Sequence, residues 1–314
     1  MDLNALTTEK RNEKTMHLDE MTPDDILTVM NEEDARVVSA VKAALPQIRK
    51  TIRHTAESLK QGGRILYIGA GTSGRLGVLD AVECPPTFGV DDNTVVGIIA
   101  GGSPAFVKAV EGAEDNPQLG RSDLIAAGLT KADTVIGLTA SGRTPYVMGA
   151  LEYANSVGCA TAAISCNENA EVFSVAEIPI ELMTGPEILA GSTRLKAGTA
   201  EKMVLNMIST ISMIEVGKVY GNLMVDVRQT NEKLACRAEN IVMQATGCSR
   251  ETARHELAAA GGETKLAITR MLLGKDLDTA RTRLALAHGK VRDALKIADA
   301  SDGAEVVQKA ISKQ

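Results

Sequence analysis

The pattern of hydrophobic and polar positions in the first part of the chain has the periodicity of an α-helix. Over residues 22–60, apolar side chains recur at intervals of three and four residues, which is the spacing of one face of an α-helix. The segment opens with Thr22-Pro23-Asp24-Asp25. Threonine can cap a helix, proline suits its first position, and acids favour its positive end. The pattern therefore predicts a helical segment ahead of the main fold.

The periodicity of the apolar positions changes at Gly63. Short apolar runs now end in glycine, serine or threonine, and each is followed by an amphipathic segment, which is the strand–loop–helix alternation of a parallel α/β sheet. The five predicted strands are Arg64–Gly69, Thr94–Gly101, Thr134–Ala140, Ala160–Ser165 and Ile178–Met183. Their nearly continuous apolar character is typical of strands that helices cover on both faces. We therefore expect an α/β fold, a five-stranded parallel sheet flanked by helices, with ligands beyond the carboxyl ends of the strands.

The last third of the chain has a different pattern. A long helix is predicted over residues 196–219, and the strand pattern disappears after Gly221. Residues 231–310 are predicted to be helical throughout, with breaks at Gly247 and at Gly261-Gly262. No motif with a chemical role is evident there, so we expect a packing or interaction module.

Composition narrows the range of partners. The 314 residues carry a formal charge of −6 and include 4 Tyr, 3 Phe and no Trp, so we expect neither a basic surface for phosphate backbones nor aromatic platforms for bases. Nucleic acid is therefore not an expected partner. No apolar run approaches the roughly 18 residues of a membrane span, and residues 1–14 contain no secretory leader pattern. We expect a cytoplasmic protein that does not enter a membrane.

The residue types that bind metals are scattered. The five cysteines have no Cys-x-x-Cys spacing, and the four histidines are isolated from one another. Neither a zinc site nor a disulfide framework is therefore predicted. We expect idle or buried thiols in a reducing compartment and no bound metal.

A glycine-rich loop follows the first predicted strand. The run Gly69-Ala70-Gly71-Thr72-Ser73-Gly74-Arg75 matches G-x-G-x-x-G and opens a helix. A dinucleotide-binding unit would end its second strand in an acid, but Ala100-Gly101-Gly102-Ser103 contains none. A P-loop would need lysine followed by serine or threonine where Arg75-Leu76 stands. Backbone amides at a helix start can still bind an anion, so the candidate phosphate-binding residues here are Gly71, Thr72 and Ser73.

Two further loops have the same character. The candidates are Ser141, Gly142 and Thr144 after the third strand, and Ser192, Arg194 and Lys196 before the long helix. Thr144 is expected to cap the helix in which Pro145 takes the first position. We expect the hydroxyls and amides of the three loops to bind a phosphate or sugar, with the two cations as candidate charge partners. The alternative is that all three are only tight turns and helix caps.

Two carboxylates are notable for their positions. Glu83 is expected to end the helix that follows the first loop, because Cys84-Pro85-Pro86 should stop it. Glu114 follows the helix that starts at Ser103-Pro104 and lies in an acid-rich stretch. The negative end of a helix and neighbouring acids both oppose ionisation of a carboxyl group. A carboxyl group in such a position is suited to general acid and base catalysis. The alternative is that both are ordinary surface acids.

Several of these runs carry a family resemblance. They are Gly69–Gly77, Asp80–Pro86, Val110–Asp115, Ala140–Tyr146, Gly191–Gly198 and Gly221–Asp226, and the likeness extends from Leu6–Asn12 into the C-terminal helices. The chain closely resembles the N-acetylmuramic acid 6-phosphate etherases. The resemblance implies a sugar isomerase (SIS) domain of the flavodoxin- or Rossmann-like three-layer type over residues 54–222, a helical segment over 1–53, and a small helical, UBA-like domain over 223–314. It also implies a homodimer with active sites between subunits, and no metal or organic cofactor.

The same resemblance implies a reaction. Such etherases cleave the bond between the D-lactyl group and C3 of N-acetylmuramic acid 6-phosphate, giving N-acetylglucosamine 6-phosphate and D-lactate during muropeptide recycling. By the family's pattern, Glu83 is the acid that protonates departing lactate and Glu114 is the base at C2. Two alternatives stay open: an aldose–ketose sugar phosphate isomerase on the same domain, and a non-catalytic sugar phosphate sensor. The presence of both glutamates argues against the sensor.

Overall fold

A computed structural model describes residues 6–108, 110–227 and 232–298. The chain divides into two compact units. The first comprises Met1–Pro85 and Val90–Ser212, and the second comprises Pro86–Gly89 and Met213–Gln314. The domain boundaries expected at 53/54 and 222/223 remain predictions.

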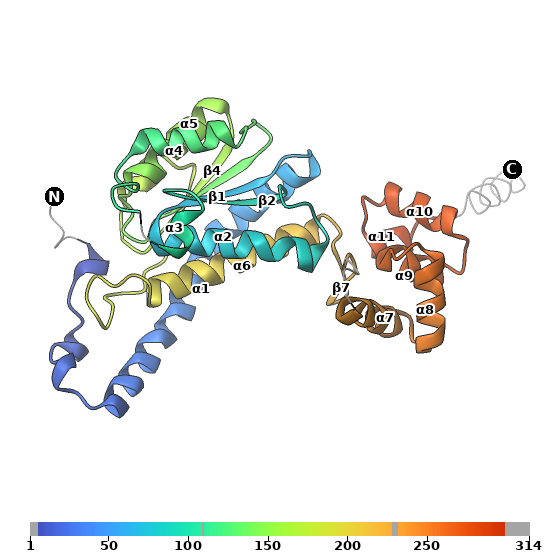
Figure 1. Ribbon diagram of the computed structural model, residues 1–314, viewed down its shortest axis with the longest axis horizontal. Coiled ribbons are helices and arrows are strands. Elements are labelled where there is room, and N and C mark those ends of the chain that lie inside the picture. The colour runs from blue at the N-terminus through green and yellow to red at the C-terminus, as the bar shows by residue number, and fades with distance from the viewer. Residues whose placement is uncertain (1–5, 109, 228–231, 299–314) are drawn as a thin grey trace, which may run out of the picture. The chain divides into compact units, whose positions relative to one another are not determined.

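A five-stranded parallel sheet forms the centre of the first unit (Figure 1). Its strands are β1 (Ile65–Gly69), β2 (Val95–Ile99), β3 (Thr134–Leu138), β4 (Ala160–Ser165) and β5 (Ile178–Glu181), in the order β2-β1-β3-β4-β5. Every neighbouring pair is parallel, so the predicted strands and fold class are confirmed. The strand order reverses between β1 and β3, and ligands of such sheets bind near that reversal, outside the carboxyl ends of the strands.

Helices cover both faces of this sheet (Figure 1). They are α1 (Pro23–Lys60), α2 (Gly71–Phe88), α3 (Pro104–Val107), α4 (Pro117–Ala126), α5 (Pro145–Val157) and α6 (Lys196–Glu215), with short 3-10 turns at Thr7–Glu9, Glu13–Thr15, Leu18–Glu20 and Glu171–Ser174. On one face, Leu124 of α4 and Leu151 of α5 are fully buried in one apolar cluster with the strands. On the other face, Gly77 of α2 lies so close to the sheet that a Cβ there would be 2.9 Å from atoms of both Tyr67 and Leu138. The flanking helices are therefore confirmed as well.

The predicted N-terminal helical segment is the long helix α1. Its start has the expected cap, since Thr22 accepts a hydrogen bond from the amide of Asp25 and Pro23 takes the first position. Near its other end, the hydroxyl of Ser58 lies 2.7 Å from that of Thr134. This buried contact ties α1 to β3, one of the two strands that border the reversal.

Two helix ends differ from the sequence-based expectation. The helix α2 continues through Pro85 and Pro86 to Phe88, so the prediction that it stops at Glu83 is wrong. Proline has a φ near the helical value, and its cost here is the loss of two amide donors. The helix α6 ends at Glu215 instead of residue 219, because Gly217 has a φ of +77° and turns the chain.

Short helices make up most of the second unit. An antiparallel pair that the sequence did not reveal, β6 (Val219–Tyr220) and β7 (Leu223–Met224), precedes α7 (Glu232–Thr246), α8 (Arg250–Ala259), α9 (Thr264–Leu273), α10 (Leu277–Leu286) and α11 (Val291–Ala294). The predicted breaks at Gly247 and Gly261-Gly262 are confirmed. The part of the helical prediction that covers residues 299–310 lies outside the described residues. Within the described part of the chain, no helix is long and apolar enough to cross a membrane.

Candidate active site

The first candidate loop joins β1 directly to α2. Two of its glycines are required by close packing, since a Cβ on Gly74 would lie 2.7 Å from the carbonyl oxygen of Gly69, and one on Gly69 would lie 2.9 Å from the amide nitrogen of Gly74. Gly71 begins the helix with a φ of +53°, a value that favours glycine. Ala70, just before it, has no side-chain oxygen with which to cap the helix. The amides of the first turn therefore present the positive end of the helix dipole, as anion-binding helix starts do.

A network of hydroxyls shapes the second loop, between β3 and α5. The Oγ1 of Thr139 lies 2.8 Å from the Oγ1 of Thr144 and 3.3 Å from the Oγ of Ser141. It also accepts a hydrogen bond from the amide of Gly142 at 3.1 Å. Gly142 has a φ of +74°, and a Cβ there would lie 2.3 Å from the Cβ of Ala170. Thr144 occupies the N-cap position as predicted, but its hydroxyl makes no cap hydrogen bond.

The start of α6 is occupied by the chain's own carboxylate. Glu187 accepts hydrogen bonds from the amides of Lys196 at 3.0 Å and Ala197 at 2.9 Å. The Nζ of Lys196 lies 2.6 Å from the Oε2 of Glu33, and both side chains are 1% exposed. Burial opposes ionisation of Glu33, but the hydrogen bond and charge of Lys196, together with hydrogen bonds from Lys14 and Asn12, outweigh it and lower the pKa of Glu33 to about 2. Lys196, a candidate substrate contact, is therefore engaged within the protein.

The remaining candidates of the third loop are accessible. Ser192 is half-buried and Arg194 is exposed. Among the described residues, none forms a hydrogen bond or ion pair with the Arg194 guanidinium. Arg194 therefore keeps its charge available for a ligand.

Thr8 and Asn167 join the second loop to the third. The Nδ2 of Asn167 donates to the carbonyl oxygens of Ala140 at 2.9 Å and Ser141 at 3.3 Å. It also donates to the Oγ1 of Thr8 at 3.0 Å, while its Oδ1 accepts from the Thr8 amide at 3.2 Å. The carbonyl oxygen of Thr8 in turn accepts from the amide of Gly191 at 3.2 Å. The N-terminal segment thus bridges two of the candidate loops.

A buried carboxyl joins the first loop to α6. Ser73, itself buried, donates to the Oε1 of Glu201 at 2.9 Å. Burial raises the pKa of Glu201 to about 8, although the bond from Ser73 opposes the shift. The Oε2 of Glu201 has no hydrogen-bond partner among the described atoms. Nearby, a Cβ on Gly198 would lie 3.5 Å from the Cγ2 of Thr72. All three candidate loops therefore meet at one edge of the sheet.

The two predicted catalytic glutamates relate differently to these loops. Glu114 lies between α3 and α4, and its carbonyl oxygen accepts a hydrogen bond from the amide of Tyr146 at 3.0 Å. This places it beside the second loop, which ends two residues earlier at Thr144. Glu83 lies on α2, twelve residues after Gly71, which is about 18 Å along a helix. Both side chains are exposed. One chain therefore brings Glu114 to the loops and leaves Glu83 away from them.

Several residues that hold the site together were missed from the sequence. They are Thr8, Thr139, Asn167, Glu187 and Glu201. Glu201 did have a signal, because it shares a helix face with Ala197, Leu205 and Ile208, all of which are fully buried. A carboxyl at that spacing predicts a buried acid. Thr139 acts within its own loop, through its contacts with Ser141, Gly142 and Thr144. Thr8, Asn167 and Glu187 act through contacts between separate segments, which leave no mark in local sequence.

The groups gathered at this edge define what it can do chemically. They are amides, hydroxyls and carboxyls. Within the described ranges, no group of three or more histidine, cysteine, aspartate or glutamate side chains is arranged to hold a metal ion. Amides and hydroxyls can hold a phosphate ester, and positioned carboxyls can transfer protons.

The five-stranded parallel sheet, with glycine- and hydroxyl-rich loops at one edge, is that of a sugar-isomerase (SIS) domain. Residues 47–155 match the family described as the glucokinase regulatory protein N-terminal SIS domain. An N-acetylmuramic acid 6-phosphate etherase of Mycolicibacterium smegmatis is 56% identical over 94% of this chain and 99% of its own length. One of Bacillus cereus is 58% identical over 93% of this chain and 100% of its own length. The chain belongs to the N-acetylmuramic acid 6-phosphate etherase family, and the resemblance inferred from the sequence is confirmed.

A solved structure is similar at a greater distance. The phosphoheptose isomerase GmhA from Neisseria gonorrhoeae is 14% identical, with a TM-score of 0.47, over 61% of this chain and 98% of its own. A likeness at that level supports no inference about activity.

Proposed function

We propose that this protein cleaves the D-lactyl ether of N-acetylmuramic acid 6-phosphate and releases N-acetylglucosamine 6-phosphate and D-lactate. Membership of the etherase family supports the choice of substrate. The structural observation that carries the proposal is the meeting of three hydroxyl-rich loops through Thr8, Asn167 and Glu201. Because this substrate derives from the cell wall, we also propose a role in peptidoglycan recycling in the cytoplasm.

In this proposal the phosphate is held where α2 and α5 begin. Its donors are the amides near Gly71 and Thr72 and the hydroxyls of Ser141 and Thr144. Ser73 contributes through its backbone, since its hydroxyl is bonded to Glu201. The shape of the second loop follows from the positive φ of Gly142.

The third loop is proposed to bind the rest of the substrate. Ser192 is the candidate for a sugar hydroxyl, and Arg194 is the candidate for the lactyl carboxylate, because an exposed guanidinium can bind a carboxylate through two hydrogen bonds. Lys196 does not contact the substrate in this scheme but supports the loop indirectly. Its pair with Glu33 holds the start of α6 in place.

Elimination explains how such an ether can break. An alkyl ether has no activated leaving group, so direct displacement by water is very slow. Ring opening exposes an aldehyde at C1, which acidifies the proton on C2. A base removes that proton, the electron pair forms the C2=C3 bond, the C3–O bond breaks, and the lactate oxygen receives a proton from an acid. Water then adds its oxygen to C3 and a proton to C2.

We assign the base at C2 to Glu114 and the acid to Glu83. Within one chain, Glu83 is about 18 Å from Gly71 along α2, which is too far for both groups to reach one sugar. The proposal therefore requires a homodimer in which Glu83 of one copy completes the site of the other. The exposure of both glutamates in the single chain supports this arrangement, because each remains available to a partner.

The direct test is to assay D-lactate after mixing purified protein with N-acetylmuramic acid 6-phosphate. Glu83→Gln is expected to abolish lactate release while the protein still folds and binds the sugar phosphate. Glu152→Gln, which changes an exposed acid on α5, serves as the matched control and should keep full activity. Full activity in Glu83→Gln would refute the role assigned to that residue.

Shared sites can be tested by producing two inactive variants together. If Glu83 and Glu114 of different copies form each site, a Glu83→Gln chain paired with a Glu114→Gln chain has one site with both glutamates intact. Random pairing makes half of the dimers hybrid, so about a quarter of the wild-type activity should return. No return of activity would contradict the shared site.

Heavy water separates the proposal from its alternatives. Elimination and water addition place solvent deuterium at C2 of the product, and retention of the original hydrogen there would exclude this route. An isomerase would release no lactate. A sensor would bind the sugar phosphate and tolerate the loss of both glutamates.

A further inference from the structure

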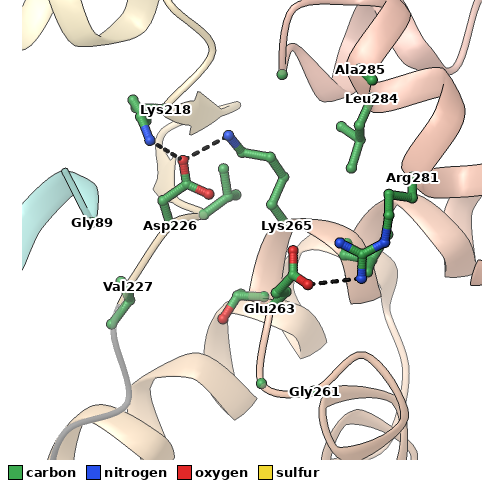
Figure 2. A pocket seen from close by; sticks show the side chains of 15 residues that line it. Gly89, Lys218, Asp226, Val227, Gly261, Glu263, Lys265, Arg281, Leu284 and Ala285 are labelled. Atoms are coloured by element: carbon green, nitrogen blue, oxygen red, sulfur yellow. Dashed lines mark hydrogen bonds and ion pairs between the residues drawn. The ribbon is translucent and has the colours of Figure 1, made fainter. Parts of the chain in front are cut away.

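The second unit contains a cavity of about 520 Å3 that the proposed catalytic site does not use. Its walls come from the segment around Asp226, from the start of α9 and from α10, and Figure 2 shows how these side chains surround it. Asp226 ends the run Gly221–Asp226, which carries part of the family resemblance but has no role in the proposed reaction. The proposed reaction therefore does not account for this cavity or for the residues that line it.

Two lysines share one carboxylate in this cavity (Figure 2). The Nζ of Lys265 lies 2.7 Å and the Nζ of Lys218 lies 3.1 Å from the Oδ2 of Asp226, and none of these side chains is more than 24% exposed. Arg281 and Glu263 form a separate pair at 2.8 Å and add no net charge. The two lysines and Asp226 together therefore carry one excess positive charge. Partial burial strengthens its attraction for an anion, because charges interact more strongly where water is partly excluded.

The start of α9 adds further donors to the same cavity. Glu263 occupies the N-cap position of this ten-residue helix and makes no side-chain cap hydrogen bond. Its first amides therefore present the positive end of the helix dipole without a capping acceptor.

Thr264 supplies an independent sign of a ligand. It is the first residue of α9, lines the cavity and is 2% exposed. Its Oγ1 has no hydrogen-bond partner among the described residues. A buried hydroxyl without a partner is costly in a folded protein. A bound acceptor atom would remove that cost.

We propose that this cavity binds the phosphate group of a small ligand, either free phosphate or a phosphate monoester. A phosphate group with one negative charge balances the excess lysine charge, and a dianion more than offsets it. Either form accepts hydrogen bonds from Lys218, Lys265, the Thr264 hydroxyl and the first amides of α9. A cation would add to the excess positive charge, and an apolar ligand would leave the hydroxyl without a partner. Leu266 and Leu284 line the same cavity and suit the carbon part of a monoester.

Two substitutions test the proposal without disturbing the fold. Lys218→Gln removes the excess charge and leaves the closer Lys265–Asp226 pair intact. Thr264→Val keeps the branched shape of the side chain and removes only the hydroxyl. Lys296→Gln is the control, because it removes a lysine charge from the same unit at a side chain that is 71% exposed.

The measurement is a titration of the full-length protein with inorganic phosphate, followed through its backbone amide NMR signals. We expect saturable shifts of the Thr264 and Lys265 signals. The affinity read from these shifts should fall about tenfold in Lys218→Gln and in Thr264→Val, as loss of one hydrogen bond to a charged group predicts. Lys296→Gln should leave it unchanged. A second titration with glycerol 3-phosphate distinguishes the two sources, since tighter binding identifies an ester and equal binding identifies free phosphate.

The proposed catalytic loops should also bind phosphate, so their signals serve as an internal reference. Shifts confined to residues such as Ser141 and Gly142, with none at Thr264, would overturn the second site and leave the etherase proposal standing. The same affinity at Thr264 in all of the variants would also overturn it. Release of D-lactate should be the same in Lys218→Gln and Thr264→Val as in the unaltered protein.

Discussion

The helices α2 and α6 begin from stretches of the same kind, rich in glycine and hydroxyls, yet their first turns differ in use. At α6, the carboxylate of Glu187 accepts from the first amides, and Lys196 is paired with Glu33. At α2, Ala70 offers no side-chain cap, and we propose that the amides of the first turn bind the phosphate instead. A glycine–serine loop before a helix therefore does not identify a phosphate site by itself. Whether the first amides of the helix can bind a ligand depends on whether an acid from elsewhere in the chain, such as Glu187, already accepts their hydrogen bonds.

The largest effect should come from the internal pair at α6. Lys196→Met would leave Glu33 buried without its closest cation, which costs about 3–5 kcal/mol of unfolding free energy in comparable cases. Urea unfolding measures this loss. Lys14→Met is the control, because Lys14 also contacts Glu33, at 3.3 Å, but is half exposed and should cost far less. Equal stability of the two variants would mean that the start of α6 does not depend on the buried pair.

The pH dependence of stability should reveal the buried hydrogen bond between Ser73 of α2 and Glu201 of α6. The pKa of Glu201 is raised by burial from its ordinary value of 4.5 to about 8, so the folded state favours the neutral acid. Its contribution is fully present below pH 4.5 and is lost as the pH rises through 8. Unfolding free energy should therefore fall by roughly 4 kcal/mol over that range relative to Glu201→Gln. Parallel stability curves for the two proteins would contradict a neutral Glu201.

A smaller effect, on binding alone, should appear at the start of α5. Ser141→Ala removes one proposed phosphate donor and is expected to raise KM about tenfold, with little change in Tm because Ser141 is half-buried. Steady-state release of D-lactate measures it. Ser156→Ala, at the other end of the same helix, removes a hydroxyl whose one hydrogen bond among the described residues is to the carbonyl of Tyr153, and it should leave KM unaltered. An unchanged KM in Ser141→Ala would remove the second loop from the proposed phosphate site.

The smallest effect should come from Glu187→Gln. The amide oxygen of glutamine can accept one of the two hydrogen bonds from the start of α6, but its nitrogen cannot accept the other. We expect a loss of about 1 kcal/mol in unfolding free energy and no direct effect on KM. A large rise in KM without loss of stability would show that α6 binds substrate with its first turn, as α2 is proposed to do.

The fold was predictable because its signals are local. Buried parallel strands appear as short apolar runs, and each of the five was found that way. The helix breaks at Gly247 and Gly261-Gly262 were also visible, since glycine is a poor helix former. The end of α2 was not predictable, because two prolines usually stop a helix, whereas here the helix continues through both to Phe88.

The candidate site was predictable only in part. The loops were found from glycine and hydroxyl residues at strand ends, but their partners lie far away in sequence. Thr8 and Asn167 are 159 positions apart, and nothing near either residue indicates the other. Likewise, nothing in the sequence near Lys196 indicates its buried partner Glu33, which lies on another helix.

The contact between Thr8 and Asn167 has a consequence for the order in which the protein assembles during translation. Thr8 leaves the ribosome well before Asn167 and Gly191, the two residues to which it docks, are synthesised. The amino-terminal segment must therefore wait in the growing chain without its final contacts. A ribosome stalled before codon 167 would carry most of the sheet and still lack the finished edge at which the loops meet.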